Sequence, residues 1–290
     1  MLAAYILLFL LFLVLPLGAL IIKSVQDSKG HFIGLSNYAL YLKEPALFQS
    51  FFNSLFIAIV STIFVVVFAF LFAYAITRTC MPFKSFFRLI ALIPLLSPSI
   101  LAAIALVYWF GNKGILKALL FGHSIYGPIG IILASIYWTF PHALMILSTS
   151  LSLSDSRLYE AAEVLKTSKL RAFLTITIPG ARYGIISTTF VVFTQVFTDF
   201  GVPKVIGGNY NVLATDIYKE VVGMQNFQMG AVISLVLLIP AMVAFFIDQY
   251  SRKKQISLLT SRSVVFNPKN SWGVDMLLSL IHISEPTRLD

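Results

Sequence analysis

A polar segment between residues 154 and 179 interrupts a chain that is otherwise mostly apolar, and it holds the residues best able to carry a function. Glu160 would lie near the start of a helix, where the helix dipole favours an anion. The residues before it can cap such a helix: Ser154, Asp155 and Ser156. Apolar residues then recur at helical spacing and form a stripe with small residues at its centre: Leu158, Ala161, Ala162 and Leu165. Such a stripe needs a cover, which either the membrane surface or another protein could supply.

The same segment predicts a second short helix. Thr167 or Ser168 can cap its start. The helix would continue through Phe173 and Leu174, and Pro179 would help to end it. Two short helices with an exposed apolar stripe point to recognition of a partner rather than to catalysis.

Other kinds of functional site find little support in the sequence. Cys80 is the single cysteine, which excludes a disulfide framework and a cysteine-based metal site and favours an inert thiol. The sequence has no glycine-rich phosphate loop ending in Lys-Ser/Thr, so we expect this chain not to bind ATP. No Ser/His/Asp or His/Glu spacing suggests hydrolysis. We therefore expect no enzyme activity, no metal and no cofactor in this chain.

The elements that must position the polar segment are membrane helices. The 290 residues are 58% hydrophobic and 11% charged, whereas soluble domains carry about 25% charged residues. Runs of about 20 apolar residues cross a bilayer, and the continuous apolar character of these runs argues against alternating barrel strands. We predict an all-α polytopic membrane protein with six transmembrane helices: Leu2–Ile22, Asn53–Ile76, Phe86–Phe110, Gly127–Ser150, Gly184–Pro203 and Gln228–Ile247.

Lysine and arginine residues are shared unevenly between the loops, which predicts the orientation of the chain. Thirteen follow the second, fourth and sixth predicted spans, and seven follow the first, third and fifth. The richer side is cytoplasmic, which places both termini and residues 154–179 inside. The net charge of +9 thus lies in loops that flank a lipid bilayer, so nucleic acid is not an expected partner. The first span has no basic residue before its apolar run, which favours a retained helix over a cleaved signal peptide.

The polar segment also carries a spaced motif: Glu160, Ala161, Ala162, Lys166, Ile176, Ile178 and Pro179. It resembles the loop of type I ABC importer permeases, whose pattern is Glu-Ala-Ala, three residues, Gly, nine residues, Ile, one residue and Leu-Pro. The likeness extends over residues 53–247. Lys166 in the glycine position is the main departure, because a side chain in a left-handed turn costs about 1–2 kcal/mol. Either the turn has another geometry here, or docking is weakened.

The resemblance implies a permease subunit in the inner membrane of a bacterium. In that family this loop docks onto a cytoplasmic ATPase dimer, which binds the ATP, and a periplasmic binding protein delivers the solute. The motif residues would then couple the subunit to the ATPase, with small alanines in a groove and Glu160 beside a basic group. Closing of the ATPase dimer would move rigid helices between two states. A second permease half would complete the path.

Some residues within the predicted spans are candidates for the translocation path: Pro94, Pro98, Pro141, His142 and Asp199. The prolines break helix hydrogen bonds, and they either line the route or are kinks relieved by neighbouring helices. His142 is either a proton carrier or a packed histidine. Asp199 is either a functional acid inside the fifth span or an interfacial residue paired with Lys204.

The solute follows only from resemblance. Residues 198–219 and 225–235 resemble permeases for 2-aminoethylphosphonate, to which ferric-iron permeases are close relatives. This resemblance implies that the solute is 2-aminoethylphosphonate. The alternative solutes are ferric iron, or a small anion other than 2-aminoethylphosphonate. An ion-coupled secondary transporter would need acids at mid-membrane depth, where only Asp199 comes close. A passive channel would leave the polar loop unexplained.

We expect four regions along the chain: a first helix with its periplasmic loop (1–52), the ABC transmembrane domain (53–247), a cytoplasmic linker (248–277) and a final segment (278–290). Apolar residues return at Trp272, as they would at the start of a fused second permease half, and self-pairing of two chains is the alternative. The final segment contains LSLIHISEPTR, which resembles translated adapter DNA. We expect it to be an artefact.

Overall fold

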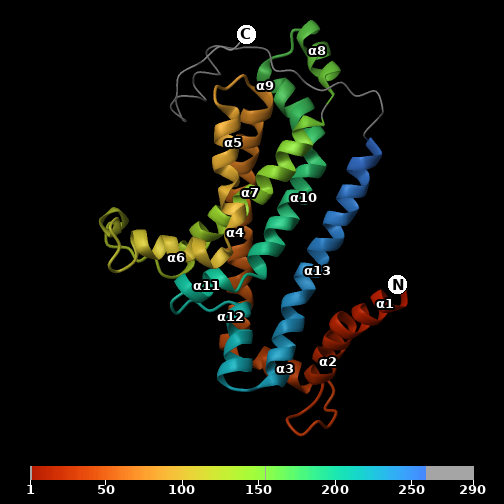
Figure 1. Cartoon of the computed structure of the whole chain (residues 1–290), viewed down its shortest axis with the longest axis vertical. Coiled ribbons are helices and arrows are strands. Elements are labelled where there is room, and N and C mark those ends of the chain that lie inside the picture. The colour runs from red at the N-terminus through yellow and green to blue at the C-terminus, as the bar shows by residue number, and fades with distance from the viewer. Residues whose placement is uncertain (1, 154, 259–290) are drawn as a thin grey trace. The chain divides into compact units, whose positions relative to one another are not determined.

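The computed structural model describes residues 2–153 and 155–258. These residues form helices joined by turns (Figure 1). An isolated antiparallel bridge pairs Gln26 with Phe32. The predicted all-α class is therefore confirmed. The predictions about Ser154, the apolar return at Trp272 and segment 278–290 lie outside the described residues.

The helices range from single turns to long spans. In chain order the α-helices are α1 Leu2–Phe9, α2 Leu15–Ser24, α3 Ser36–Lys43, α4 Pro45–Arg78, α5 Lys84–Leu92, α6 Ser99–Phe110, α7 Pro128–Ser152, α8 Ser156–Val164, α9 Lys169–Ala172, α10 Ile178–Phe197, α11 Gly201–Ile206, α12 Leu213–Tyr218 and α13 Phe227–Leu258. Wider π-helical segments follow α1, α9 and α12: Leu10–Val14, Phe173–Thr177 and Lys219–Gly223. Tighter 3₁₀ turns occur at Ile93–Leu96 and Lys117–Leu120.

Five helical runs of the described chain are long and apolar enough to cross a membrane: Ala4–Ser24, Pro45–Arg78, Pro128–Ser152, Lys169–Phe197 and Phe227–Ser251. A bent pair, Lys84–Leu96 with Ser99–Phe110, is a sixth candidate. Each overlaps one of the six predicted spans. The apolar window of the first run contains no buried residue, as suits a helix surrounded by lipid, and Ser24 at its end is buried.

The third predicted span is wrong as one continuous helix. The helical residues that begin with α5 end at Leu96, and α6 begins at Ser99, at an angle of 104° to them. Pro98 explains the break, because a residue before proline is pushed from the helical into the extended region. Ser97 accordingly has φ −108° and ψ 140°. The Pro94 carbonyl accepts hydrogen bonds from both the N–H and the Oγ of Ser97, at 3.1 and 3.0 Å, so Ser97 closes the end of this helical segment.

The fifth predicted span is displaced. The helical run covers Lys169–Phe197 rather than Gly184–Pro203. It therefore takes in Pro179, and the prediction that this proline helps to end a separate short helix is wrong. The π segment Phe173–Thr177 accounts for the difference. Its wider turn accommodates a proline, which has no N–H and would crowd the preceding turn of a regular α-helix.

Two compact units divide the chain, and each has its own core. Unit 1 consists of Met1–Ala58, Ala103–Ile131 and Phe197–Val243, and unit 2 consists of Ile59–Ala102, Ile132–Val196 and Ala244–Asp290. Phe197, Ile206 and Leu213 are among the fully buried side chains of unit 1. Unit 2 buries Leu144, Leu147 and Leu151, whose spacing places them on one face of α7.

A glycine lets two helices of unit 2 approach closely. A Cβ atom added to Gly184 of α10 would lie 2.2 Å from Oγ and 2.3 Å from Cβ of Ser150 on α7. Any side chain at this position would therefore clash. Small residues at such crossings are typical of helices that pack in membranes, where close contact replaces the hydrophobic driving force.

Candidate functional site

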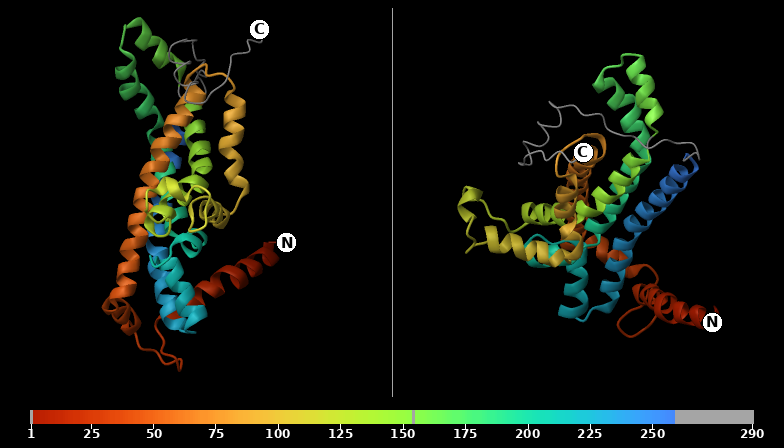
Figure 2. Two further views of the ribbon diagram at one scale, coloured as in Figure 1. Left: turned by 90° about the vertical axis from the view of Figure 1, so that its left-hand side faces the viewer. Right: turned by 45° about the horizontal axis from the view of Figure 1, so that its top comes forward.

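The polar segment folds as α8, a turn and α9. Asp155 caps α8, since its Oδ1 accepts a hydrogen bond from the backbone N–H of Arg157 at 3.1 Å. Ser168 caps α9 in the same way and accepts from the N–H of Arg171 at 3.3 Å. These two residues fill the predicted capping positions. In each view α8 lies beyond the end of α4 (Figures 1 and 2).

α8 has one exposed face and one buried face. Glu160 and Ala161 are exposed, and Val164 is 82% exposed. Ala162 faces inward and is only 8% exposed. Tyr159, about one turn earlier on the same side of α8, is half-buried. The prediction that Ala162 belongs to the exposed stripe is therefore wrong. Successive residues differ by about 100° around a helix, so the two alanines face different surroundings.

The turn after α8 has the left-handed geometry for which the family pattern uses glycine. Lys166 has a φ of 51°, so the alternative of a different geometry is wrong. Its N–H donates to the Glu163 carbonyl at 3.0 Å, and the N–H of Thr167 donates to the Ala162 carbonyl at 2.9 Å. This pair of bonds is the Schellman arrangement that ends many helices. The lysine therefore sits in a conformation that costs about 1–2 kcal/mol.

The later residues of the motif lie in the helical run that begins with α9. Ile176 and Ile178 are half-buried, and Pro179 is exposed. Leu170 and Leu174, on the same run, are exposed as well. The exposed apolar surface thus continues beyond α8 along the next helix.

Aromatic contacts hold the start of this helical run against α4. The ring centroid of Phe173 lies 6.1 Å from that of Phe70 and 5.5 Å from that of Tyr74, both in edge-on geometry. Such pairs are worth about 0.5–1.5 kcal/mol beyond the burial of their area. Within unit 2, the exposed residues of α9 are therefore followed directly by a residue, Phe173, that packs against α4.

Arg78 is a residue of this site that sequence reasoning missed. Counting basic residues places it among the loop charges, yet its side chain at the end of α4 is 8% exposed. Its Nη2 donates to the Leu151 carbonyl at 2.7 Å, and its Cζ lies 4.7 Å from the centre of the Tyr159 ring. The Tyr159 hydroxyl lies 2.9 Å from Oγ1 of Thr177. These residues are far apart in the sequence, so no spacing signals the contact.

The predicted path residues lie at different places in the fold. Pro141 is buried inside α7, which continues through it. His142 is half-buried, with its ring centroid 6.1 Å from that of Trp138, a contact that suits the packed interpretation. Pro94 is buried and Pro98 is exposed, and the two flank the break before α6. Whether these residues line a path stays a prediction.

Asp199 lies outside the long helix α10, which ends at Phe197, so the alternative that placed this acid inside the fifth span is wrong. Its Oδ2 accepts a hydrogen bond from the N–H of Val202, in the first turn of α11, at 2.9 Å. Lys204, its predicted partner, places Nζ 4.3 Å from the centre of the Tyr218 ring. The Asp199 carboxylate thus stabilises the start of a short helix at the point where α10 has ended.

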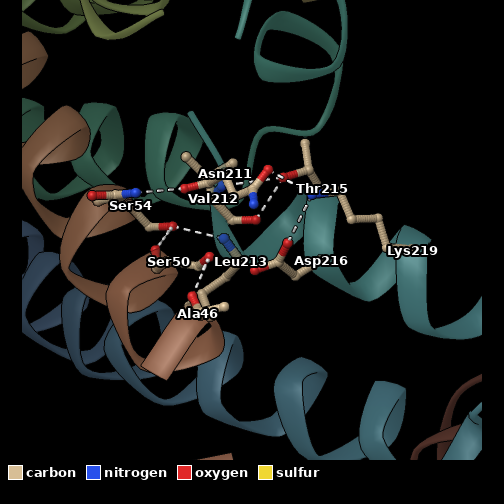
Figure 3. Close-up of polar contacts among 10 residues, drawn as sticks. Ala46, Ser50, Ser54, Asn211, Val212, Leu213, Thr215, Asp216 and Lys219 are labelled. Atoms are coloured by element: carbon tan, nitrogen blue, oxygen red, sulfur yellow. Dashed lines mark hydrogen bonds and ion pairs between the residues drawn. The ribbon is translucent and has the colours of Figure 1, made fainter. Parts of the chain in front are cut away.

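Residues 211–219 are held against the start of α4 by polar contacts within unit 1 (Figure 3). Ser54 Oγ accepts from the N–H of Leu213 at 2.9 Å. Lys219 donates to the Asn211 side-chain oxygen and lies 3.5 Å from the buried Asp216 carboxylate. These bonds order part of residues 198–219, one of the two segments on which the predicted solute rests.

Tyr41 of α3 shares the environment of Asp216. Its hydroxyl donates to the Leu47 carbonyl at 3.5 Å. Burial, with a further contribution from the negative charge of Asp216, raises the pKa of this hydroxyl to about 12. The neutral phenol is therefore the form that suits the folded state.

A family match identifies the class of transport protein to which this fold belongs. Residues 81–256, more than half of the chain, match the family described as binding-protein-dependent transport system inner membrane component. The chain belongs to this family, whose members are polytopic inner-membrane proteins.

Particular relatives include permeases for two kinds of solute. The ferric transport system permease protein FbpB of Actinobacillus pleuropneumoniae is 28% identical over 255 residues, which are 85% of this chain and 37% of that protein. The spermidine/putrescine transport system permease protein PotB of Escherichia coli K12 is 26% identical over 214 residues, which are 71% of this chain and 78% of that protein. The chain spans about two fifths of the length of the ferric relatives that it matches.

Solved structures share the fold. A chain in the crystal structure of a bacterial ABC transporter involved in import of the acidic polysaccharide alginate matches with a TM-score of 0.68 at 17% identity, over 90% of this chain and 95% of that chain. The alginate transporter in complex with an alginate pentasaccharide-bound periplasmic protein matches with a TM-score of 0.66, also at 17% identity, over 91% and 95% of the two chains. The predicted ABC importer permease fold is therefore confirmed.

Proposed function

We propose that this chain is a membrane-spanning permease subunit of an ATP-driven importer, and that α8 docks onto a cytoplasmic ATPase. The observation that carries the proposal is the two-sided structure of α8. Ala161 and Val164 are exposed, while Tyr159 and Ala162 face the rest of unit 2, to which α8 itself belongs. A small residue within the exposed face lets the helix enter a groove, and Glu160 offers a carboxylate to a basic group there.

The motif residues then divide into two sets. Glu160, Ala161 and Pro179 are exposed and would contact the ATPase directly. The others shape or support that surface: Ala162, Lys166, Ile176 and Ile178. Ala162 does so from the buried face of α8, and Lys166 does so in the turn that ends it. A test of docking must therefore change Ala161 and not Ala162, because a larger residue at position 162 would disturb the packing beneath α8.

Replacement of Ala161 by Trp tests docking. The indole ring should be too large for the groove of the ATPase. Co-purification of the ATPase and solute uptake should therefore both fall at least about tenfold, which corresponds to a loss of about 1.4 kcal/mol in the free energy of binding. Ala161→Ser is the size-matched control and should behave as wild type. Ala118→Trp makes the same change at another exposed alanine and should also be silent. Wild-type co-purification by Ala161→Trp would refute the proposed docking surface.

The proposed orientation places both termini and α8 in the cytoplasm of a bacterial cell. Its support is the excess of basic residues in the loops on that side. Lys166 and Asn209 are both exposed and lie on opposite predicted sides. In a Cys80→Ser background, an impermeant thiol reagent should label Asn209→Cys in intact cells and Lys166→Cys only after lysis. Labelling of Lys166→Cys in intact cells would reverse the orientation.

The complete importer would contain further components. We infer a periplasmic binding protein, an ATPase dimer that binds the ATP, and a second permease half that is either fused or an identical chain. The family description supports the binding protein. The residues that the structure describes contain one such docking helix, whereas an ATPase dimer would offer two docking sites. Photolabelling with an azido derivative of ATP should mark the ATPase and not this chain. Labelling of this chain at stoichiometric yield would contradict that assignment.

The proposed solute is 2-aminoethylphosphonate, because residues 198–219 and 225–235 resemble permeases for that compound. Ferric iron is a second candidate, and the likeness to the ferric permease of Actinobacillus pleuropneumoniae favours it. Uptake of labelled 2-aminoethylphosphonate and of radioactive ferric iron into cells with the whole transporter would separate the two. Uptake of iron alone would leave the permease assignment intact and overturn the phosphonate.

A further inference from the structure

α8 is a short helix whose ends are closed locally. It has nine residues, begins at the Asp155 cap and ends in the left-handed turn at Lys166. A movement of such a helix would change only the conformation of the adjoining turns, unless side chains connect the helix to the long helices. Side chains on the buried face of α8 make such a connection.

A single guanidinium group connects α8 with two long helices of unit 2. Arg78 is the last residue of α4, and its Nη2 donates to the Leu151 carbonyl of α7 at 2.7 Å. The same group lies over the Tyr159 ring of α8, with Cζ 4.7 Å from the ring centre. Tyr159 also reaches Thr177, the last residue of the π-helical segment that leads into α10, which is 1% exposed; the Tyr159 hydroxyl lies 2.9 Å from Oγ1 of Thr177. The pair thus joins α8 to three helices at one point.

The chemistry of this point favours arginine over lysine. Leu151 lies in the last turn of α7, where carbonyls have no partner within the helix and a positive charge is favoured. A guanidinium is planar, so its edge donates to a carbonyl while its face stacks on an aromatic ring. A lysine ammonium has no such face. Arg78→Lys therefore keeps the charge and one donor but loses the stacked contact with α8.

We propose that Arg78 and Tyr159 are positioning residues that transmit the movement of a docked α8 into α4 and α7. This proposal rests on the proposed docking of α8 to the ATPase. When α8 moves, the Tyr159 ring moves with it and displaces the guanidinium of Arg78. Because Arg78 is the last residue of α4 and binds the Leu151 carbonyl, the ends of α4 and α7 then move as well. Without the pair, α8 still docks, but its movement is lost in the adjoining turns.

This role differs measurably from simple support of the fold. If the pair only stabilised α8, its loss would weaken ATPase binding, and transport and ATP hydrolysis would fall together. If the pair transmits movement, the ATPase remains bound and hydrolyses ATP, while less solute crosses for each ATP consumed. The ratio of ATP hydrolysed to solute transported separates the two roles.

The experiment uses the whole transporter, reconstituted in lipid vesicles with its binding protein and solute. Arg78→Lys and Tyr159→Leu should both retain co-purified ATPase and raise the ATP consumed per solute. Tyr159→Leu removes the cation–π contact altogether and should raise that ratio by roughly tenfold, the factor that one desolvated contact of this kind can control. Arg78→Lys keeps a cation near the ring and should raise the ratio by a smaller factor. Tyr159→Phe keeps the ring and loses only the hydroxyl contact with Thr177, so its ratio should stay closer to wild type. Ala161→Trp, which should lose the ATPase itself, reports separately on the docking proposal.

Each other result would count against the link. An unchanged ratio in both Arg78→Lys and Tyr159→Leu would overturn it, even if docking through Ala161 holds. Loss of bound ATPase in proportion to transport would show that the pair only supports α8. Failure of both variants to accumulate in the membrane would make the pair a folding requirement and would likewise overturn the proposal.

Discussion

Replacement of Lys166 by glycine should stabilise the turn between α8 and α9. The wild-type residue holds a φ of 51°, a conformation that costs a residue with a side chain about 1–2 kcal/mol. Glycine removes that cost but loses about 0.5–1 kcal/mol through the greater freedom of the unfolded chain. The net gain is about 0.5–1 kcal/mol, without any new contact.

Hydrogen exchange at three amides would measure this gain. The N–H groups of Leu165, Lys166 and Thr167 donate to carbonyls of α8 at 3.0, 3.0 and 2.9 Å. A gain of 0.5–1 kcal/mol in the free energy of local opening slows their exchange about two- to fivefold. The measurement is made on the chain in lipid nanodiscs without its ATPase, so that docking does not contribute.

Lys166→Ala is the matched control, because it removes the lysine side chain and keeps the Cβ atom that causes the strain. Its exchange rates should stay near wild type. Equal protection in Lys166→Gly and Lys166→Ala would show that the lysine chain, and not the left-handed backbone, limits the stability of the turn. Faster exchange in the glycine variant would refute the reasoning altogether.

Two further perturbations test the packing of the units. Gly184→Ala should destabilise unit 2 by about 1–3 kcal/mol, because its Cβ would meet Ser150 at 2.2 Å, and thermal unfolding in detergent should show a lower midpoint than for Gly223→Ala, whose position is open. Addition of Ser150→Gly should restore most of the loss, and no rescue would place the clash elsewhere. Tyr41→Phe tests the raised pKa near 12: the unfolded phenol ionises at about 10, so the stabilising contribution is fully present below pH 10 and is lost between pH 10 and 12. The free energy of unfolding of wild type should therefore fall by about 2 kcal/mol relative to Tyr41→Phe over that range, and parallel curves would contradict the assignment.

The sequence was sufficient for features that depend on local pattern. Apolar runs located the membrane helices, since burial of about 20 residues in lipid leaves a continuous signal. Asp155 and Ser168 could be named as alternatives for helix caps because capping chemistry involves neighbouring residues. The left-handed turn at Lys166 could be suspected from the motif, although the choice between two geometries needed the backbone itself.

Other features depend on contacts that no local pattern encodes. The contact between Arg78 and Tyr159 joins residues that are far apart in the sequence. A basic residue directly after an apolar run is ordinarily interpreted as a charge in a loop, so nothing in the sequence indicated that Arg78 is buried. Ala162 was misplaced because both alanines fit one stripe in the sequence, whereas the buried side is decided by what packs beneath α8. The break at Pro98 was foreseeable as a kink, but its angle of 104° was not.

The π-helical segment Phe173–Thr177 sets the angular phase between α9 and α10. A π turn contains one residue more than an α turn, and each residue advances a helix by about 100°. Deletion of one residue here would restore a regular helix and turn α9 by about 100° about its axis relative to α10. Leu170 would then point in another direction, although every residue of the α8 surface remained. Substitutions in this segment preserve the phase, so its length is under a stricter constraint than its composition.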